Sequence, residues 1–166
     1  MKTTATVTVH IRWLILRDVR EVLAIEALSW PDPWTEDDFL ACLRQRNCIG
    51  MVAEVGEKIV GYMVYEIFVS RLRLFKLAVD PQYRRRGIGQ QMVDKLTSKL
   101  AGQLAGRRRT RITADVPETN MDALLFLRAH GFEATRVMRD FFETEDGIRM
   151  VFQIPAEASS DQEDGE

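Results

Sequence analysis

The sequence predicts a mixed α/β (α+β) fold built around one mainly antiparallel sheet. The chain has 166 residues and a hydrophobic content of 46%, which is enough for one complete core and short for two domains. Segments with strand periodicity alternate with segments of helical spacing, and two pairs of strand segments are separated only by short turns, as in antiparallel hairpins. We therefore expect a single domain over residues 1–156.

The first part of the chain predicts one strand followed by two helices. Residues 6–14 mix threonine with β-branched residues, which favours a strand. In residues 18–29 the apolar positions recur at helical spacing. The run Pro31-Asp32-Pro33 interrupts this pattern, and Thr35 then has the character of an N-cap, because three acidic residues follow it in the first turn of a second helix.

The middle of the chain predicts a hairpin, a further strand and a long helix. The expected strands cover residues 48–55, 58–68 and 72–79. From Ile88 onward apolar residues recur at helical spacing, so we expect a helix that ends near Gly102 or Gly106.

The last part predicts a strand, a helix and a second hairpin. The expected strand covers residues 110–116, and the helix covers residues 120–130 and is stopped by Gly131-Phe132. Residues 133–142 and 148–154 would pair across Glu145-Asp146-Gly147. The complete order contains about seven strands and about four helices.

The charge distribution separates a basic body from an acidic end. The formal net charge is −2, but residues 157–166 hold five acids and no base, so the preceding body is near +3. The segment 157–166 lacks apolar anchors and is expected to be a disordered tail. A modestly basic body suits an anionic cofactor. The net charge of this body is far below that of a domain that binds duplex DNA. The cluster Arg107-Arg108-Arg109 also lacks interleaved aromatics, so we expect no nucleic-acid partner.

The cysteines and the N-terminus exclude two further classes. Cys42 and Cys48 lack C-x-x-C spacing, and only two histidines could join them, so we expect free structural thiols and no metal. The first residues lack the charged and apolar regions of a signal peptide, and no apolar stretch is long enough to span a bilayer. We expect a cytoplasmic protein with no membrane partner, either a monomer or a homodimer.

The most informative segment is LAVDPQYRRRGIGQQMVDK, residues 77–95. Two glycines without a Cβ let the backbone curl until successive N–H groups point inward, and the following helix adds the positive end of its dipole. The P-loop pattern is absent, and the dinucleotide fingerprint fails because its third glycine would fall at Met92. What remains is [Q/R]-x-x-G-x-[G/A], with Arg84, Gly87 and Gly89 at its fixed positions. This pattern predicts a phosphate-binding loop.

This loop, with a strand before it and a helix after it, resembles the pyrophosphate loop of the GCN5-related N-acetyltransferase (GNAT) superfamily. Within the superfamily the chain is most similar to the ribosomal-protein alanine N-acetyltransferases, over roughly residues 20 to 150. The resemblance is carried by Ile25-Glu26, Pro33-Trp34-Thr35, the segment LAVDPQYRRRGIG, and Asn120 placed eleven residues before Gly131-Phe132. It implies the GNAT fold, acetyl-CoA as cofactor with CoA as product, and direct attack by an amine through a tetrahedral intermediate.

The resemblance also implies a set of cofactor-binding residues: Leu77, Ala78, Val79, Arg84, Arg85, Arg86, Gly87, Ile88, Gly89, Gln90 and Asn120. The backbone N–H of Val79 corresponds to the donor for the oxyanion. Splaying of the strand at Asp80-Pro81 would free backbone groups of Leu77 and Val79 for the pantetheine amides. Asn120 either contacts the cofactor or N-caps its helix.

Two carboxylates are candidates for the proton transfer that an attacking amine requires. Asp115 lies at the end of a strand, five residues before Asn120, where the resembling family carries a glutamate base; otherwise it caps or solvates a turn. Glu26 would hold the substrate ammonium or share the base role, or it would be a surface residue paired with Arg20 or another base. Trp30 and Trp34 either wall an acceptor pocket or pin the loop to the core.

Two departures from the family pattern affect the acceptor and the general acid. The family's tyrosine acid corresponds to Leu127, which has no proton to donate. Its paired tyrosines, which hold a peptide N-terminus, correspond to Phe141-Phe142. The leading hypothesis is an N-acetyltransferase acting on a protein or peptide α-amine. The alternatives are a small-molecule amine as acceptor, or a non-catalytic acyl-CoA-binding module.

Overall fold

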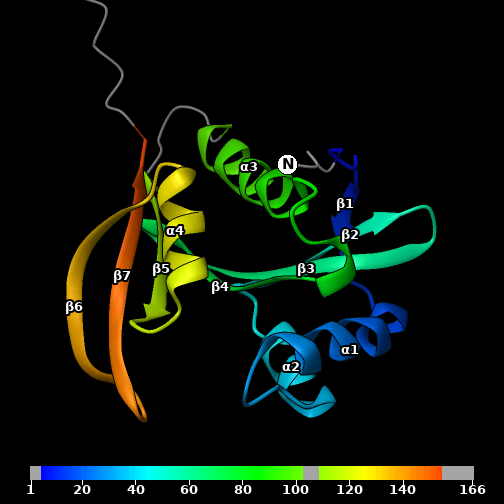
Figure 1. Cartoon of the computed structure of the whole chain (residues 1–166), viewed down its shortest axis with the longest axis horizontal. Helices are drawn as coiled ribbons and strands as arrows, with labels where there is room; N and C mark the ends of the chain where they lie inside the picture. Colours follow the sequence, from blue (N-terminus) through cyan, green and yellow to red (C-terminus); the bar gives the residue numbers. More distant parts are fainter. Residues whose placement is uncertain (1–4, 103–108, 155–166) are drawn as a thin grey trace, which may run out of the picture.

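The computed structural model describes residues 5–102 and 109–154, and it contains seven strands and four α-helices (Figure 1). The strands are β1 (His10–Trp13), β2 (Cys48–Val55), β3 (Lys58–Ile67), β4 (Arg71–Val79), β5 (Arg111–Pro117), β6 (Glu133–Phe142) and β7 (Glu145–Gln153). The helices are α1 (Val19–Ser29), α2 (Glu36–Leu43), α3 (Ile88–Ala101) and α4 (Met121–Ala129). Short 3₁₀ turns cover Leu16–Asp18 and Pro81–Tyr83.

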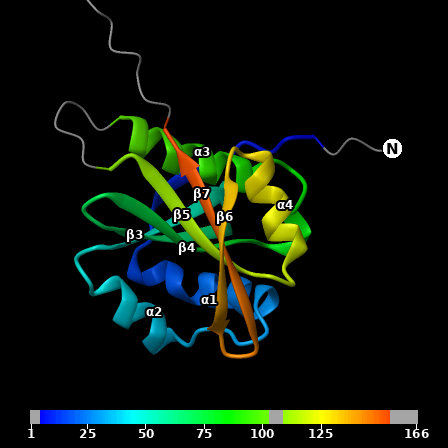
Figure 2. The ribbon, with the colours of Figure 1, turned by 90° about the vertical axis from the view of Figure 1, so that its left-hand side faces the viewer.

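All seven strands belong to one sheet in the order β1-β2-β3-β4-β5-β7-β6. Only β4 and β5 pair in parallel, and every other neighbouring pair is antiparallel. The predicted mixed fold with a mainly antiparallel sheet is therefore confirmed. Helices α1 and α2 lie on one side of the strands β2 to β4, and α3 lies on the other side (Figures 1 and 2).

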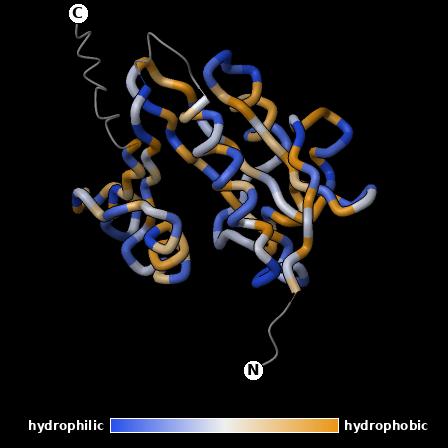
Figure 3. Tube along the Cα trace, turned by 90° about the horizontal axis from the view of Figure 1, so that it is seen from above, coloured by the Kyte–Doolittle hydropathy of each residue, from blue (hydrophilic) through white to orange (hydrophobic). Residues whose placement is uncertain are grey.

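Two hydrophobic clusters fill the space between the sheet and these helices. The larger cluster joins α3 and α4 to the sheet and includes Met92, Leu96 and Leu127. The smaller cluster lies under α1 and α2 and includes Val22 and Phe39. Hydrophobic and hydrophilic stretches alternate along individual elements (Figure 3), as expected where one side of an element faces a core.

Several predicted boundaries need correction. The first strand covers only His10–Trp13, because the residues before it lie beside α3 instead of pairing with β2. The last hairpin reverses at residues 143–144, so β7 begins at Glu145 and not at Ile148. Thr35 does cap α2, accepting a hydrogen bond from the N–H of Asp38. The predictions for Gly106, for Arg107 and Arg108, and for the tail 157–166 lie outside the described residues.

The sheet opens between β4 and β5. Only residues 71–73 of β4 pair with residues 111–113 of β5. Beyond them β4 continues with β3 and β5 continues with β7. The predicted splaying thus exists, but it starts after Arg73 and not at Asp80-Pro81. It leaves one edge of the second half of β4 open.

A bulge in β4 lies beside this opening. Val64 of β3 pairs with Lys76, but the next residue, Tyr65, pairs with Leu74, so Phe75 is an extra residue. A bulge re-aims side chains, and here Phe75 and Lys76 both contact Trp34. Two successive residues of β4 therefore face the same side, toward α1 and α2.

In the described part of the chain, no helix is both long and apolar enough to span a bilayer.

Candidate active site

The predicted phosphate loop forms the N-terminal end of α3. Gly87 is the N-cap, with a left-handed φ of 77°, and Arg85 is also left-handed, with φ 62°. Only a residue without a Cβ adopts such a conformation without strain, which explains the glycine at position 87. The two left-handed residues at positions 85 and 87 curl the backbone into a concave turn that suits an anion.

The backbone donors of this turn fit a phosphate group. Among the described residues, the N–H groups from Arg85 to Gln90 have no hydrogen-bond acceptor. The first N–H groups of any helix lack partners within the helix, and they attract anions together with the helix dipole. The glycine at position 89 also lets the start of α3 pack closely against α4, because a Cβ there would lie 3.1 Å from Cζ of Phe126. The loop residues therefore fit the pyrophosphate of acetyl-CoA.

The arginines of the loop have separate surroundings. Nε of Arg84 donates to the carbonyl of Val79 at 3.0 Å, and its guanidinium also reaches Oγ of Ser29 at 3.5 Å. The guanidinium of Arg86 lies 5.3 Å from the ring centre of Tyr83. Arg84 thus ties the end of β4 to α1, and Arg86 stacks within the loop.

The open edge of β4 presents the two backbone groups that the sequence predicted. The N–H of Asp80 donates to Val60 on β3, whereas the carbonyl of Val79 accepts from Arg84 on the other side. Successive peptide groups of a strand point to opposite edges. The N–H groups of Leu77 and Val79 therefore point into the opening, while Ala78 packs in the core under α1 and α2.

Two residues of α4 bear on the predicted chemistry. The side chain of Asn120 accepts a hydrogen bond from the N–H of Ala123 at 3.2 Å, so it caps α4. Leu127, at the position of the family's tyrosine acid, is buried in the larger hydrophobic cluster. The helix consequently offers no proton donor at that position.

Glu26 lies at the centre of a buried polar cluster. Its side chain is fully buried and accepts from the backbone N–H of Trp34 at 3.0 Å, from the hydroxyl of Tyr62 and from Nζ of Lys76. Burial, and next the carboxylate of Glu26, raises the pKa of Tyr62 well above its ordinary value. Glu26 is therefore buried and not a surface residue, and the base with which it pairs is Lys76 and not Arg20.

The two tryptophans enclose the same cluster. Nζ of Lys76 lies 4.2 Å from the ring centre of Trp34 and 5.2 Å from that of Trp30, and Nε1 of Trp30 donates to the hydroxyl of Tyr62 at 3.0 Å. Trp34 also packs edge-on against Phe39 in the core. Both rings are thus anchored to the body of the protein, and Trp34 in addition lines a pocket.

Asp115 lies on the other strand of the opening, within a network of charges. Its two oxygens accept from Nε and Nη2 of Arg149 at 2.9 and 3.2 Å, and Nε of Arg73 lies 3.8 Å away. The hydrogen bond to Asp115 raises the pKa of Arg149 above its ordinary value. The Asp115 side chain is only 3% exposed, so it is a carboxylate anchored at the edge of the opening.

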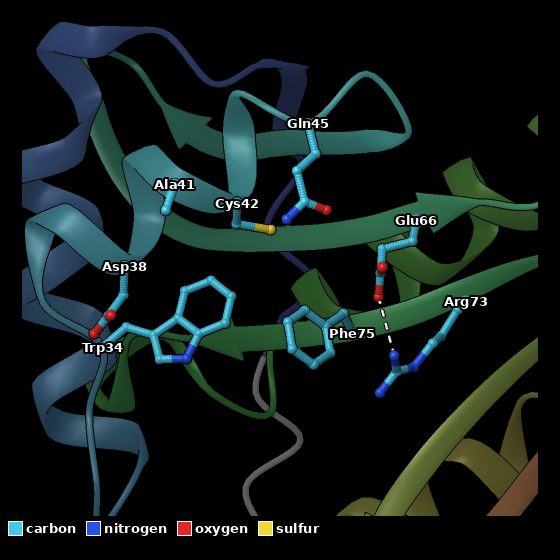
Figure 4. Close-up of a pocket in the computed structure, with 8 residues that line it drawn as sticks. All are labelled: Trp34, Asp38, Ala41, Cys42, Gln45, Glu66, Arg73 and Phe75. Atoms are coloured by element: carbon cyan, nitrogen blue, oxygen red, sulfur yellow. Dashed lines mark hydrogen bonds and ion pairs between the residues drawn. The ribbon is translucent and has the colours of Figure 1, made fainter.

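A pocket of ≈ 370 Å³ adjoins this network on the side of α2 (Figure 4). It is lined by Trp34, Asp38, Ala41, Cys42, Gln45, Glu66, Arg73 and Phe75. Trp34 and Phe75 form an aromatic wall, with ring centres 5.3 Å apart. Arg73 donates to Glu66 at 3.1 Å inside the pocket and also lies beside Asp115. One arginine therefore connects the pocket to the predicted base.

The structure adds residues that the sequence did not single out. Lys76 and Tyr62 surround Glu26, Arg149 pairs with Asp115, and Gln91 lies beside the phosphate loop. Lys76 lies in the predicted strand 72–79, directly before Leu77, so its position was a usable signal. The partner of Asp115 depends on the register of β5 with β7, in which Asp115 opposes Arg149.

Comparisons with known proteins agree with this geometry. The model of the acetyltransferase (GNAT) family matches residues 16–132, more than half of the chain. The ribosomal protein bS18 alanine N-acetyltransferase of Escherichia coli (strain K12) is 25% identical over 130 residues, covering 78% of this chain and 84% of that protein. The N-alpha-acetyltransferase of Sulfurisphaera tokodaii is 26% identical over 154 residues, covering 85% and 90%.

Solved structures show the same fold. The crystal structure of the ribosomal-protein-S18-alanine N-acetyltransferase from Escherichia coli superimposes with a TM-score of 0.79 at 22% identity, covering 92% of this chain and 98% of that one. The family match, the phosphate loop at the start of α3 and the opening beside β4 agree with one another. This chain belongs to the acetyltransferase (GNAT) family and is an acyltransferase that uses acetyl-CoA.

Proposed function

We propose that the protein transfers the acetyl group of acetyl-CoA to the α-amine at the N-terminus of a peptide or protein. One observation carries this proposal, namely what surrounds the opening between β4 and β5. The phosphate loop lies at one end of the opening. On the side of α2 lie Asp115 and a pocket, and Arg73 lines this pocket and also contacts Asp115. An acceptor can therefore place its amine at the opening and its neighbouring side chain in the pocket.

Each part of the loop and of β4 has a task in cofactor binding. Bound acetyl-CoA supplies the acetyl group as an activated thioester. The N–H groups from Arg85 to Gln90 would hold the pyrophosphate, and those of Leu77 and Val79 would hold the pantetheine arm and the carbonyl oxygen. Asn120, which caps α4 through its side chain, would keep that helix in place beside the loop.

Asp115 is the proposed base. An acceptor ammonium must lose a proton before it attacks, and a positioned carboxylate accelerates such a step by roughly 10²–10⁴-fold. The two hydrogen bonds from Arg149 fix the direction of the Asp115 side chain. Because Asp115 is nearly buried, the proton would reach it through a bridging water.

Glu26 has a positioning role in this proposal. Both of its oxygens accept hydrogen bonds from the protein, one of them from Lys76. The acceptor ammonium would have to displace Lys76 to bind there. Glu26 instead fixes the backbone of Trp34, and Trp34 forms a wall of the pocket.

The pocket and the named relatives support a peptide acceptor. One relative is named for the alanine of a ribosomal protein and another as an N-alpha-acetyltransferase. A pocket of ≈ 370 Å³ has room for an amino-acid side chain next to the reacting amine. A small amine would leave this pocket unfilled and would gain no binding energy from it.

The test is release of free CoA thiol from acetyl-CoA with a panel of N-terminal peptides and a panel of small amines. We expect turnover with peptides, and in Asp115→Asn a loss of kcat of about 10²-fold, as for removal of a general base. The matched control is Asp122→Asn, an exposed residue in the first turn of α4, which should keep the wild-type rate. Turnover confined to small amines would overturn the peptide acceptor, and an unchanged Asp115→Asn rate would overturn the base.

A further inference from the structure

The chain before β1 lies along the start of α3 instead of extending the sheet. The N–H of Val7 donates to the carbonyl of Arg86 at 2.9 Å. Thr6 sits directly on the turn, because its Cγ2 would be 3.1 Å from a Cβ built on Gly87. We call residues 5–9 the N-terminal strap. It contacts the phosphate loop at the residue whose left-handed conformation shapes the loop.

The side chain of Gln91 fastens this strap to the loop. Its Oε1 accepts from the N–H of Val9 at 3.0 Å, and its Nε2 donates to the carbonyl of Val7 at 2.7 Å and to the carbonyl of Gly87 at 3.1 Å. One half-buried amide thus makes three hydrogen bonds, two to the strap and one to the N-cap of α3. Such an arrangement uses both ends of the amide group.

The contacts of the strap fix the direction of the loop's donors. In a trans peptide group the C=O and the following N–H point in opposite directions, and the described residues contain no cis peptide bond. The carbonyl of Arg86 accepts from the N–H of Val7, and the carbonyl of Gly87 accepts from both the backbone N–H and Nε2 of Gln91, at 3.2 and 3.1 Å. The N–H of Gly87 shares a peptide group with the Arg86 carbonyl and must therefore point away from the strap, and the N–H of Ile88 must likewise point away from Gln91.

We propose that Gln91 and the N-terminal strap pre-organise the phosphate loop for acetyl-CoA, with Gln91 as a positioning residue. The inference rests on the proposed binding of the pyrophosphate by this loop. Loop donors that are already aligned lose less conformational freedom when the cofactor binds. By reciprocity, bound acetyl-CoA must also stabilise the strap on α3.

The experiment compares wild type with Gln91→Met, which keeps the length of the side chain and its helix propensity but removes all three hydrogen bonds. Acetyl-CoA binding to the full chain is measured by calorimetry, and kcat and KM are measured for both substrates. We expect the dissociation constant and the KM for acetyl-CoA to rise about tenfold, the size of a lost hydrogen-bond contribution. The acceptor KM and the kcat at saturating acetyl-CoA should change by less than about twofold, because the variant still reaches the same bound state.

Two further measurements separate positioning from stability. Lys95→Met places the same new side chain on an exposed position one turn along α3 and should bind acetyl-CoA as the wild type does. Thr6→Ala removes the contact with Gly87 and should weaken acetyl-CoA binding by about twofold to threefold, since a few dispersion contacts are lost. Acetyl-CoA should also slow hydrogen exchange at the amides of Val7 and Val9 in the wild type and not in Gln91→Met.

The outcomes distinguish this inference from the proposed function. If Gln91→Met unfolds at a lower temperature but binds acetyl-CoA as tightly as the wild type, Gln91 is merely structural and the inference is overturned, while the proposed acyl transfer stands. If wild type itself does not bind acetyl-CoA, the loop assignment and the inference fail together. Should Gln91→Met not fold, equal affinities of wild type and Thr6→Ala would still refute the role of the strap.

Discussion

β3 and β6 are both ten residues long, yet they occupy opposite environments in the same sheet. In β3 the seven successive residues 59–65 are buried, whereas in β6 no residue is buried and eight are exposed. β3 lies between α1 and α2 on one face and α3 on the other, while β6 is the last strand of the sheet (Figures 1 and 2).

This difference in burial separates the molecule into two halves with different packing. The half around β3 holds the Glu26 cluster and the strand and loop proposed to bind the cofactor, and it is tightly packed, so small displacements there are costly. The half around β6 and β7 supplies Arg149, the partner of Asp115, from a hairpin with register shifts. A tightly packed half with few exposed residues therefore faces a more exposed half across the opening between β4 and β5.

The largest effect should come from the buried pair in the packed half. Glu26→Gln keeps the shape of the side chain but leaves the ammonium of Lys76 without its anionic partner. Removing one member of a buried ion pair costs about 3–5 kcal/mol of the free energy of unfolding. Urea denaturation monitored by tryptophan fluorescence measures this loss.

The matched control for this change is Glu133→Gln on the exposed strand β6, which should shift the free energy of unfolding by less than about 0.5 kcal/mol. Combining Glu26→Gln with Lys76→Met should recover part of the lost stability, because neither charge then remains unpaired. Additive losses in the double variant would show that Glu26 and Lys76 are not coupled.

A slightly smaller effect should follow from truncating an apolar side chain in each half. Met63 of β3 is fully buried in the larger cluster, while Val137 of β6 is 58% exposed. Met63→Ala should lower the free energy of unfolding by about 3 kcal/mol, because apolar burial is lost and a cavity remains. Val137→Ala should cost less than about 0.5 kcal/mol. Similar losses at the two positions, measured by thermal unfolding, would contradict the division into a packed and a looser half.

The smallest of these effects concerns Asp18, and it depends on pH. Asp18 is buried and accepts from Arg12 at 2.7 and 2.9 Å and from the N–H of Ile15 at 2.9 Å. The hydrogen bonds from Arg12 hold its pKa below the usual value of 3.8. A lowered pKa stabilises the folded state above the unfolded pKa, and this stabilisation disappears as the pH falls through the folded value.

Asp18→Asn should therefore lower the free energy of unfolding by about 2 kcal/mol at pH 7, which is the usual contribution of hydrogen bonds to a charged group. The difference from the wild type should narrow below about pH 4, where the unfolded carboxyl becomes protonated. Urea midpoints of both proteins between pH 7 and pH 3 measure it. If the difference between the two urea midpoints stayed constant over this pH range, the ion pair with Arg12 would be excluded as the cause of that difference.

The local features of the site were predictable because neighbouring residues create them. The phosphate loop needs two glycines at fixed spacing, a strand before them and a helix after them, and all of these are readable within residues 77–95. The caps at Thr35 and Asn120 are equally local, since each side chain bonds an N–H three residues on. The expected role of residues 6–14 as a strand failed in its first half, where Gln91 binds the chain instead.

The sequence by itself determined the mixed fold and the strand-loop-helix of the proposed cofactor site, because periodicity and turn chemistry act over a few residues. The resemblance to the GNAT family singled out the candidate carboxylates Asp115 and Glu26. Only the tertiary structure decided what those carboxylates contact. Lys76 reaches Glu26 across 50 residues of sequence and Arg149 reaches Asp115 across 34. Such pairs depend on strand register, on the bulge at Phe75 and on the packing of α1 against the sheet, and these arise only when distant segments bury their apolar faces together.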